Sequence, residues 1–156
     1  MVDIAIRDEK FDDWPQLLAL IRHAFAYMEA RIDPPSSLRL LDEQTIAEKA
    51  QAETLLLAYE EGRLIGCVFL RDLGETMYLG KLAVDPAAQQ SGIGRALVDH
   101  ALSHCRSRAK RRIMLESRVE LSEVHDFFRR QGFRQTGTTA HTGYDRPTAI
   151  VMEIEL

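Results

Sequence analysis

The amino-acid sequence predicts an α+β fold in which four helices flank one sheet of about seven strands, within a single domain over residues 1–156. Two patterns favour this fold. Some segments alternate apolar and polar residues with the period of a strand, and others repeat apolar residues at three- and four-residue steps, as a helix does. These segments follow one another as strand, two helices, three strands, helix, strand, helix and two strands, without a regular strand–helix alternation.

The N-terminal third begins with a strand over residues 2–8, followed by a helix over about 11–30. The apolar positions of that helix are Trp14, Leu17, Leu18, Ile21, Phe25 and Met28. Pro34 and Pro35 interrupt the helical pattern, because proline cannot continue a helix. Asp42 is placed to cap a second helix that runs to about residue 52. We therefore expect a loop over residues 31–41 between two helices.

The middle of the chain carries three strands and a helix. Residues 54–70 are two apolar strands joined by a turn at Glu61 and Gly62, and residues 77–84 are the next strand. A third helix follows, whose apolar residues step by four: Ile93, Leu97, Ala101 and Cys105.

The C-terminal part completes the predicted sheet. A short strand over 112–118 precedes a fourth helix, which Gly132 ends. The apolar residues of this helix are Leu121, Val124, Phe127 and Phe128. A strand over about 132–138, a polar loop over 139–147 and an alternating strand over 148–156 close the chain.

Charge and hydropathy narrow the classes of partner. The formal net charge is −4, whereas broad nucleic-acid or anionic-membrane binding needs a dominant positive field. The basic cluster at 106–112 falls at a helix end, where cations are favourable. No basic segment precedes an apolar stretch at the N-terminus, and no apolar run approaches the ~20 residues of a membrane span. We expect a cytoplasmic protein with small ligands.

The cysteines and histidines do not indicate a metal site. Cys67 and Cys105 lack metal-ligand spacing, and both are expected to be buried and inert. His100 and His104 are four residues apart on the third helix, but no glutamate follows His100 as in zinc proteases. We expect this pair to lie on a solvated helix face.

The stretch QQSGIGRAL, residues 89–97, is the strongest local motif. A loop meets a helix at Gly92–Gly94, so several backbone N–H groups point outward at the positive end of the helix dipole. Glycine lets backbone approach a phosphate closely, and the side chains of Gln89 and Ser91 can add donors. The motif predicts a phosphate cradle.

Two familiar phosphate loops fit this motif poorly. A Walker loop needs lysine and then serine or threonine after its last glycine, but Arg95 and Ala96 follow Gly94. A dinucleotide-binding turn starts at the strand end, whereas seven residues separate Val84 from Gly92, and Leu97 occupies the place of the third glycine. Glu116 lies about where an acidic ribose partner would stand, yet the order of elements differs from that fold.

Together with two further segments, the motif resembles the GCN5-related N-acetyltransferase (GNAT) family. The resemblance rests on LAVDP at the end of a strand, Gln-x-x-Gly-x-Gly at residues 89, 92 and 94, and FFRRQGF at 127–133. The element order agrees over essentially the whole chain. This resemblance implies a mixed, mostly antiparallel sheet and binding of acetyl-coenzyme A as co-substrate.

The resemblance also implies positions for the cofactor. The pyrophosphate would lie on backbone N–H groups from Gln90 to Ala96, and the pantetheine arm along the strand near Leu82. The backbone N–H of Leu82 would polarise the thioester oxygen. The cofactor-binding residues expected on this basis are Leu82, Ala83, Val84, Gln89, Gln90, Ser91, Gly92, Ile93, Gly94, Arg95, Ala96, His125 and Phe128.

The chain departs from the family at Phe128, where members often carry a tyrosine that protonates the leaving sulfur. A thiol of pKa ~8.5 that leaves as thiolate at pH 7 forfeits only about 2 kcal/mol, so loss of that acid need not abolish catalysis. Tyr78 and Tyr144 are candidates for the acid, although Tyr78 alternates with Leu82 and Val84 and would also fit a core position. His125, Glu116 and Lys81 are candidates for a base or for holding the acceptor.

Lys81 is the unexpected residue of its strand, because a lysine there needs water, a carboxylate or a bulge at Gly80. We hypothesise that Lys81 faces a cleft and binds an acidic group of the acceptor. Glu116 on the adjacent strand either pairs with Lys81 or binds the acceptor. The two polar loops, 31–41 and 139–147, would wall the acceptor site, which makes these residues candidates for specificity: Arg31, Asp33, Ser36, His141, Tyr144, Asp145 and Arg146.

The leading hypothesis is an N-acetyltransferase that acts on a small-molecule amine, with a peptide N-terminus as the second acceptor class. The net acidity favours basic or neutral acceptors, which Lys81 and arginines near the cleft would reverse locally. A non-catalytic acyl-CoA-binding module is the alternative, and a dinucleotide oxidoreductase is a third hypothesis. Family members often pair, so a homodimer is a possible assembly.

Overall fold

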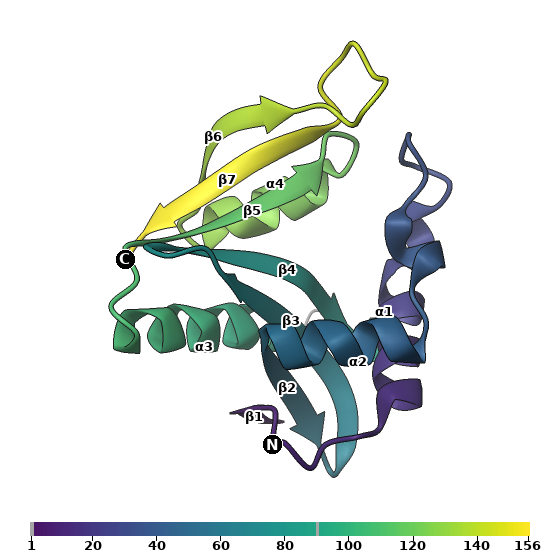
Figure 1. The fold of residues 1–156 in the computed structure, drawn as a ribbon, viewed down its shortest axis with the longest axis vertical. Helices are drawn as coiled ribbons and strands as arrows, with labels where there is room; N and C mark the ends of the chain where they lie inside the picture. Colours follow the sequence, from purple (N-terminus) through teal and green to yellow (C-terminus); the bar gives the residue numbers. More distant parts are fainter. Residues whose placement is uncertain (1, 90) are drawn as a thin grey trace.

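The sheet is the frame of the fold, and its seven strands lie in the order β1-β2-β3-β4-β5-β7-β6 (Figure 1). This arrangement comes from a computed structural model that describes residues 2–89 and 91–156. All neighbouring strands are antiparallel except β4 and β5, which confirms the predicted mixed, mostly antiparallel sheet. The strands are β1 (Val2–Ile6), β2 (Thr54–Glu60), β3 (Arg63–Asp72), β4 (Thr76–Val84), β5 (Arg112–Arg118), β6 (Arg134–Thr139) and β7 (Ala149–Glu155).

The four predicted α-helices are present in the described residues. They are α1 (Trp14–Phe25), α2 (Glu43–Ala52), α3 (Ile93–Ser107) and α4 (Ser122–Arg130), with 3-10 turns η1 (Ala26–Met28), η2 (Ser37–Leu40) and η3 (Pro86–Ala88). The first helix is shorter than predicted, because the Asp13 side chain caps its start and the last residues tighten into η1. In the part of the chain that the structure describes, no helix has both the length and the apolar character of a membrane span.

Apolar residues are buried on both faces of the sheet, which explains the nearly continuous apolar runs of β2 and β3. Val68 and Leu70 pack with α3 and with Phe128 of α4, whereas Cys67 and Phe69 pack with α1 and α2. Burial of a side chain such as that of Phe69, fully inaccessible here, contributes about 1.5–3 kcal/mol. The helices therefore cover both faces and hold the strands in place.

β4 and β5 are paired over only part of their length. Thr76, Met77 and Tyr78 pair with residues 112–114, and β4 then continues to Val84 without a partner on that side. Figure 1 shows the two strands diverging beyond this short ladder. The divergence exposes main-chain and side-chain groups of both strands in the middle of the sheet.

A β-bulge interrupts β4 where it diverges. Cys67 of β3 lies opposite Ala83 and Phe69 lies opposite Gly80, so Val68 faces both Lys81 and Leu82. Lys81 has a positive φ of 48°. The bulge thus lies just after Gly80, the position at which the sequence suggested one.

The bulge reverses the side-chain alternation of β4. Met77 and Leu79 pack in the same cluster as Leu82 and Val84, because one extra residue separates the two pairs. Tyr78 therefore does not share a face with Leu82 and Val84, and the alternation predicted from the sequence is wrong at this point. Tyr78 is half-buried rather than part of the core.

Candidate active site

Two cavities lie beside the diverging strands, and they share part of their walls. The first, here called the β4–β5 cavity, has a volume of about 460 Å³ and is lined by both strands and by the segment after α1. The second, here called the α3 groove, has a volume of about 490 Å³ and runs between the start of α3 and α4. The residues that line both are Phe25, Tyr27, Leu82, Val124 and Phe128. The cavities therefore meet at the β4 bulge.

The start of α3 forms one wall of the groove. Gly92 precedes the helix with a φ of 85°, and a Cβ added there would meet no atom within 4 Å. In the described residues no side chain caps this helix, and its first turn carries no acidic residue. The N–H of Ala96 is bonded to the Gly92 carbonyl at 3.0 Å, so the unpaired N–H groups of the first turn precede Ala96. An uncapped helix start beside open space is suited to an anion.

The expected side-chain donors of this loop are engaged within the loop itself. The Gln89 amide donates to the Val84 carbonyl at 3.3 Å, and the Ser91 hydroxyl donates to the Ala88 carbonyl. These two side chains hold the loop in shape, so the prediction that they add phosphate donors is not supported by their contacts. Gln90 was also predicted to bind the cofactor, but it lies outside the described residues.

Two arginines line the groove and supply positive charge. Arg95 belongs to the motif, and its Nε lies 3.9 Å from Asp99 Oδ2 in an exposed ion pair. Arg130 comes from the end of α4, which packs opposite α3. Sequence reasoning missed Arg130, because nothing local to residue 130 indicates that the helix end returns to the phosphate motif.

The junction of the two cavities is formed by Leu82, Phe128 and Tyr27. Phe128 is only 4% exposed and packs edge-on against Phe127 and Phe133, with ring centroids 5.1 and 5.3 Å apart. Tyr27 lies on η1 and is 44% exposed, and burial raises the pKa of its hydroxyl, with a further contribution from Glu123. Sequence reasoning did not single out Tyr27, which the predicted helix over 11–30 included without a role.

His125 does not reach either cavity. Its side chain is 7% exposed, and Nε2 lies 2.9 Å from the Arg118 carbonyl oxygen. The ring holds the start of α4 against the end of β5, so a surface position is wrong. Its expected place beside the cofactor stays a prediction that the lining of the two cavities does not support.

Tyr78 and Glu116 face each other across β4 and β5 in the β4–β5 cavity. The Tyr78 hydroxyl donates to Glu116 Oε1 at 3.5 Å, and Thr139 donates to Oε2 at 2.8 Å. Burial, and then the charge of Glu116, raise the pKa of Tyr78. The predicted pairing of Glu116 with Lys81 is not formed, because the bulge and the divergence of the strands separate the two residues.

Lys81 lines the same cavity, as the sequence suggested. It is half-buried, and burial, followed by the nearby charge of Lys49, lowers the pKa of its ammonium group. Its carbonyl oxygen accepts a weak hydrogen bond from the Cys67 thiol at 3.7 Å. Lys81 is therefore a charged group placed at a strained point of the central strand, next to Leu82.

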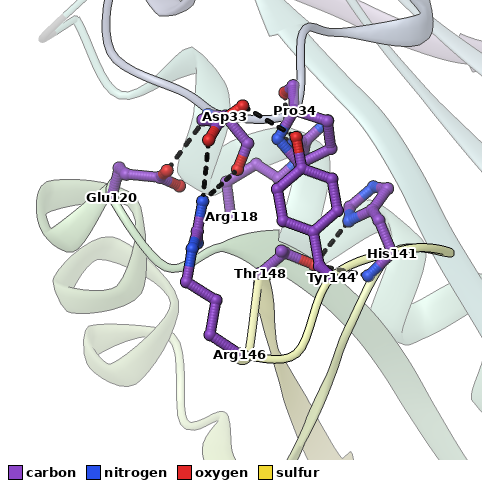
Figure 2. Close-up of polar contacts among 8 residues, drawn as sticks. All are labelled: Asp33, Pro34, Arg118, Glu120, His141, Tyr144, Arg146 and Thr148. Carbon is purple, nitrogen blue, oxygen red and sulfur yellow. Dashed lines mark hydrogen bonds and ion pairs between the residues drawn. The ribbon is translucent and has the colours of Figure 1, made fainter.

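The two predicted specificity loops are joined by a set of polar contacts that we call the clasp, formed by Asp33, Tyr144 and Arg146 with Arg118 (Figure 2). Asp33 accepts from Tyr144 at 2.8 Å and from Arg146 at 2.9 Å, and Arg118 donates to the Pro34 carbonyl at 2.7 Å. Contact with Asp33 raises the pKa of Tyr144.

The clasp changes the roles expected for several residues. Asp33 and Tyr144 were predicted to contact the acceptor, and Tyr144 to act as an acid, but neither lines a cavity. Arg31 is bound to Glu123 and to the Glu120 carbonyl instead. Ser36 and His141, from the same two loops, do line the β4–β5 cavity. The loops thus wall the cavity as predicted, through two of the seven residues that the sequence analysis named.

In the described residues, an uncapped helix start, a bulged central strand and two cavities that meet at the bulge suit an acyltransferase of the coenzyme A-dependent class. The sequence profile of the acetyltransferase (GNAT) family matches residues 14–133. The chain therefore belongs to the GNAT family and is an acetyl-CoA-dependent acetyltransferase.

Relatives of known name agree with this family. An IAA acetyltransferase of Azospirillum brasilense is 30% identical over 122 residues, 77% of this chain and 78% of that protein. A mycothiol acetyltransferase of Cellulomonas flavigena is 32% identical over 102 residues, 56% of this chain. This match spans only 28% of the mycothiol acetyltransferase.

Solved structures share the fold at lower identity. The PaiA N-acetyltransferase of Thermoplasma acidophilum, in complex with coenzyme A, has a TM-score of 0.83 at 18% identity, with 99% of each chain covered. A GNAT family acetyltransferase of Elizabethkingia anophelis, with acetyl-CoA bound, has a TM-score of 0.73 at 18% identity, covering 99% of this chain and 98% of that one.

Proposed function

We propose that this protein transfers the acetyl group of acetyl-CoA directly to the amine of a small molecule. The observation that carries the proposal is the junction of the two cavities at the β4 bulge. A donor in the α3 groove and an acceptor in the β4–β5 cavity would meet beside Leu82, where the reacting atoms need to be adjacent.

The donor would occupy the α3 groove. Its pyrophosphate would contact the N–H groups at the start of α3, with Arg95 and Arg130 adding charge. The pantetheine arm would follow β4 beside Leu82 and Val84, where the strand lacks a partner on the β5 side. The thioester would then lie at the junction.

The reaction would proceed by direct attack. The neutral amine nitrogen forms a bond to the thioester carbonyl carbon, negative charge develops on the carbonyl oxygen, and the carbon–sulfur bond then breaks to release coenzyme A. A bulge leaves one strand residue without its ladder partner, which supports the backbone N–H of Leu82 as the donor to the oxyanion.

Two proton transfers accompany this reaction. An amine of pKa ~10.4 costs about 4.6 kcal/mol to deprotonate at pH 7, whereas one of pKa ~8 costs about 1.4 kcal/mol. Glu116 lines the acceptor side and can accept this proton. Tyr27 lines both cavities, and we assign to it the protonation of the leaving thiolate in place of Phe128.

The clasp supports a small molecule over a peptide N-terminus as acceptor. Asp33 joins the loop after α1 to the loop between β6 and β7, and both loops contribute to the wall of the β4–β5 cavity. A polypeptide would have to pass these contacts, whereas a ligand that fits within about 460 Å³ would not.

Release of free thiol from acetyl-CoA, measured with a chromogenic disulfide across a panel of amines, tests the proposal. Both cysteines of the chain are buried and burial raises the pKa of each thiol, so the folded protein contributes little background. Acetylated amine and thiol in equal amounts are expected. Tight acetyl-CoA binding with no thiol release from any amine would instead support the non-catalytic module.

A further inference from the structure

We propose that the acceptor carries a carboxylate in addition to its amine, as an amino acid does. This inference rests on the proposed function, and it is drawn from the charges that line the β4–β5 cavity. Those charged residues are Lys49, Arg71, Lys81, Glu116 and Arg118. Four cations and one carboxylate surround this cavity in a chain whose formal net charge is −4.

Most of this positive charge is not neutralised by the protein. Lys49 lies 2.7 Å from Glu53 and is compensated. Arg118 donates to the neutral carbonyls of Pro34 and Pro35, and Arg71 lies 4.9 Å above the ring of Tyr78. Across residues 2–89 and 91–156, no carboxylate comes within 4.0 Å of the charged groups of Arg71, Lys81 or Arg118.

Arg71 is exposed, but Lys81 and Arg118 are half-buried. Half-buried cations without a counter-ion are unfavourable, because burial removes hydration that nothing replaces. The effect is visible at Lys81, whose ammonium pKa is lowered by burial and by Lys49. A carboxylate of the ligand would supply the missing counter-charge and would be held by charge-assisted hydrogen bonds. Such a ligand would gain affinity from charges that cost the free protein stability.

The charges are also distributed as a zwitterion requires. The two lysines, Lys49 and Lys81, stand on α2 and β4, whereas Glu116 stands on β5. The two arginines lie on the Glu116 side, since Arg118 is also on β5 and Arg71 packs over the ring of Tyr78. An ammonium group beside Glu116 and a carboxylate near Lys81 would each face the opposite charge. The cations come singly from separate elements, an arrangement that suits a monoanionic carboxylate better than a phosphate dianion.

Matched acceptors test the inference. Several L-amino acids and the corresponding carboxamides, which present the same amine without the negative charge, are compared by kcat/KM for thiol release. We expect the amino acids to be preferred at least tenfold, mainly through a lower KM. Equal kcat/KM values within each pair would overturn the inference while leaving the proposed function intact, and no acetylation of any amine would instead overturn the proposed function.

The variant Lys81→Met tests whether the preference for a carboxylate depends on the charge of the β4–β5 cavity. Methionine keeps the length of the side chain and tolerates the positive φ no worse than lysine does, so the two proteins differ mainly in charge. The carboxylate preference should fall at least tenfold in Lys81→Met. It should remain in the control Lys10→Met, which makes the same charge change at an exposed residue outside both cavities.

A further comparison tests whether the cavity prefers an acceptor with a different anionic group. O-phosphoethanolamine compared with ethanolamine presents a phosphate in place of the carboxylate. A preference for the phosphate acceptor over every amino acid, or an unchanged carboxylate preference in Lys81→Met, would overturn the assignment.

Discussion

Tyr144 donates a hydrogen bond of 2.8 Å to Oδ1 of Asp33, and so joins two loops that are 111 residues apart in the sequence. The same carboxylate accepts from Arg146 at 2.9 Å, although both partners of this ion pair are largely exposed. Exposed ion pairs contribute little to stability, because water and salt screen them. The clasp therefore contributes little to the free energy of unfolding, and its role is to hold the two loops together beside the β4–β5 cavity.

The variant Asp33→Ala should loosen the clasp without unfolding the protein. Because the β4–β5 cavity would lose the tie between its two loops, we expect KM for small acceptors to rise severalfold and bulky amines to become better substrates. Steady-state kinetics with amines of increasing size, together with thermal unfolding, would measure both effects. Asp145→Ala removes an exposed carboxylate of the other clasp loop, between β6 and β7, and serves as the matched control.

Two variants at Gly92 should separate charge from shape in the phosphate cradle. Asparagine and aspartate both tolerate a positive φ better than most residues, so Gly92→Asn and Gly92→Asp share the strain at 85°. Only aspartate places a negative charge where the pyrophosphate would bind. Coenzyme A should bind Gly92→Asp at least tenfold more weakly than Gly92→Asn by calorimetry. Equal affinities in two folded variants would contradict the placement of the cofactor.

Tyr27→Phe should lower kcat by about tenfold to thirtyfold at pH 7, because a thiol of pKa ~8.5 would then leave unprotonated. The pKa of Tyr27 is raised from 10.0, so the acid stays protonated through the neutral range, and its contribution should decline only above about pH 10. The pH profile of kcat measures both features. Tyr59→Phe is the control, because Tyr59 lines neither cavity; equal losses in both variants would exclude the assigned role.

Cys67 should make stability fall with pH in alkaline solution. Burial raises the pKa of its thiol from 9.0 to about 12. Above pH 9 the unfolded chain ionises this thiol while the folded protein cannot, so the stabilisation present below pH 9 is lost towards pH 12 at about 1.4 kcal/mol per pH unit. Urea unfolding between pH 9 and 11 should show a shallower loss for Cys67→Ala than for the unchanged protein. If the free energy of unfolding fell equally steeply with pH in both proteins, the pKa of the Cys67 thiol would not be raised in the folded state.

Local signals account for the parts of the fold that the sequence predicted well. Asp42 accepts from the N–H of Thr45 at 2.8 Å and caps α2 as expected, and Glu61 and Gly62 form the predicted turn with positive φ values. The cap and the turn each depend on residues only a few positions apart, so the local sequence is enough to predict them. That residues 1–156 form a single domain stays a prediction.

The contacts of the site residues were harder to predict, because long side chains bind whichever partner the fold brings near. Arg31 was predicted to bind the acceptor, but its guanidinium group donates to the carboxylate of Glu123, which is 92 residues away in the sequence. His125 bonds to the Arg118 carbonyl for the same reason. A residue's type indicated that it would form polar contacts, but only the folded chain decided with which group.

The sequence by itself determined the order of the elements, the turn into α3 and the family, since these depend on periodicity and on glycines at fixed spacing. The tertiary structure decided the β4 bulge and the divergence of β4 from β5, because the pairing of two residues with Val68 is a property of the β3–β4 ladder. That ladder places Lys81 in the wall of the β4–β5 cavity and Leu82 at the junction, and so sets the charge of the cavity wall.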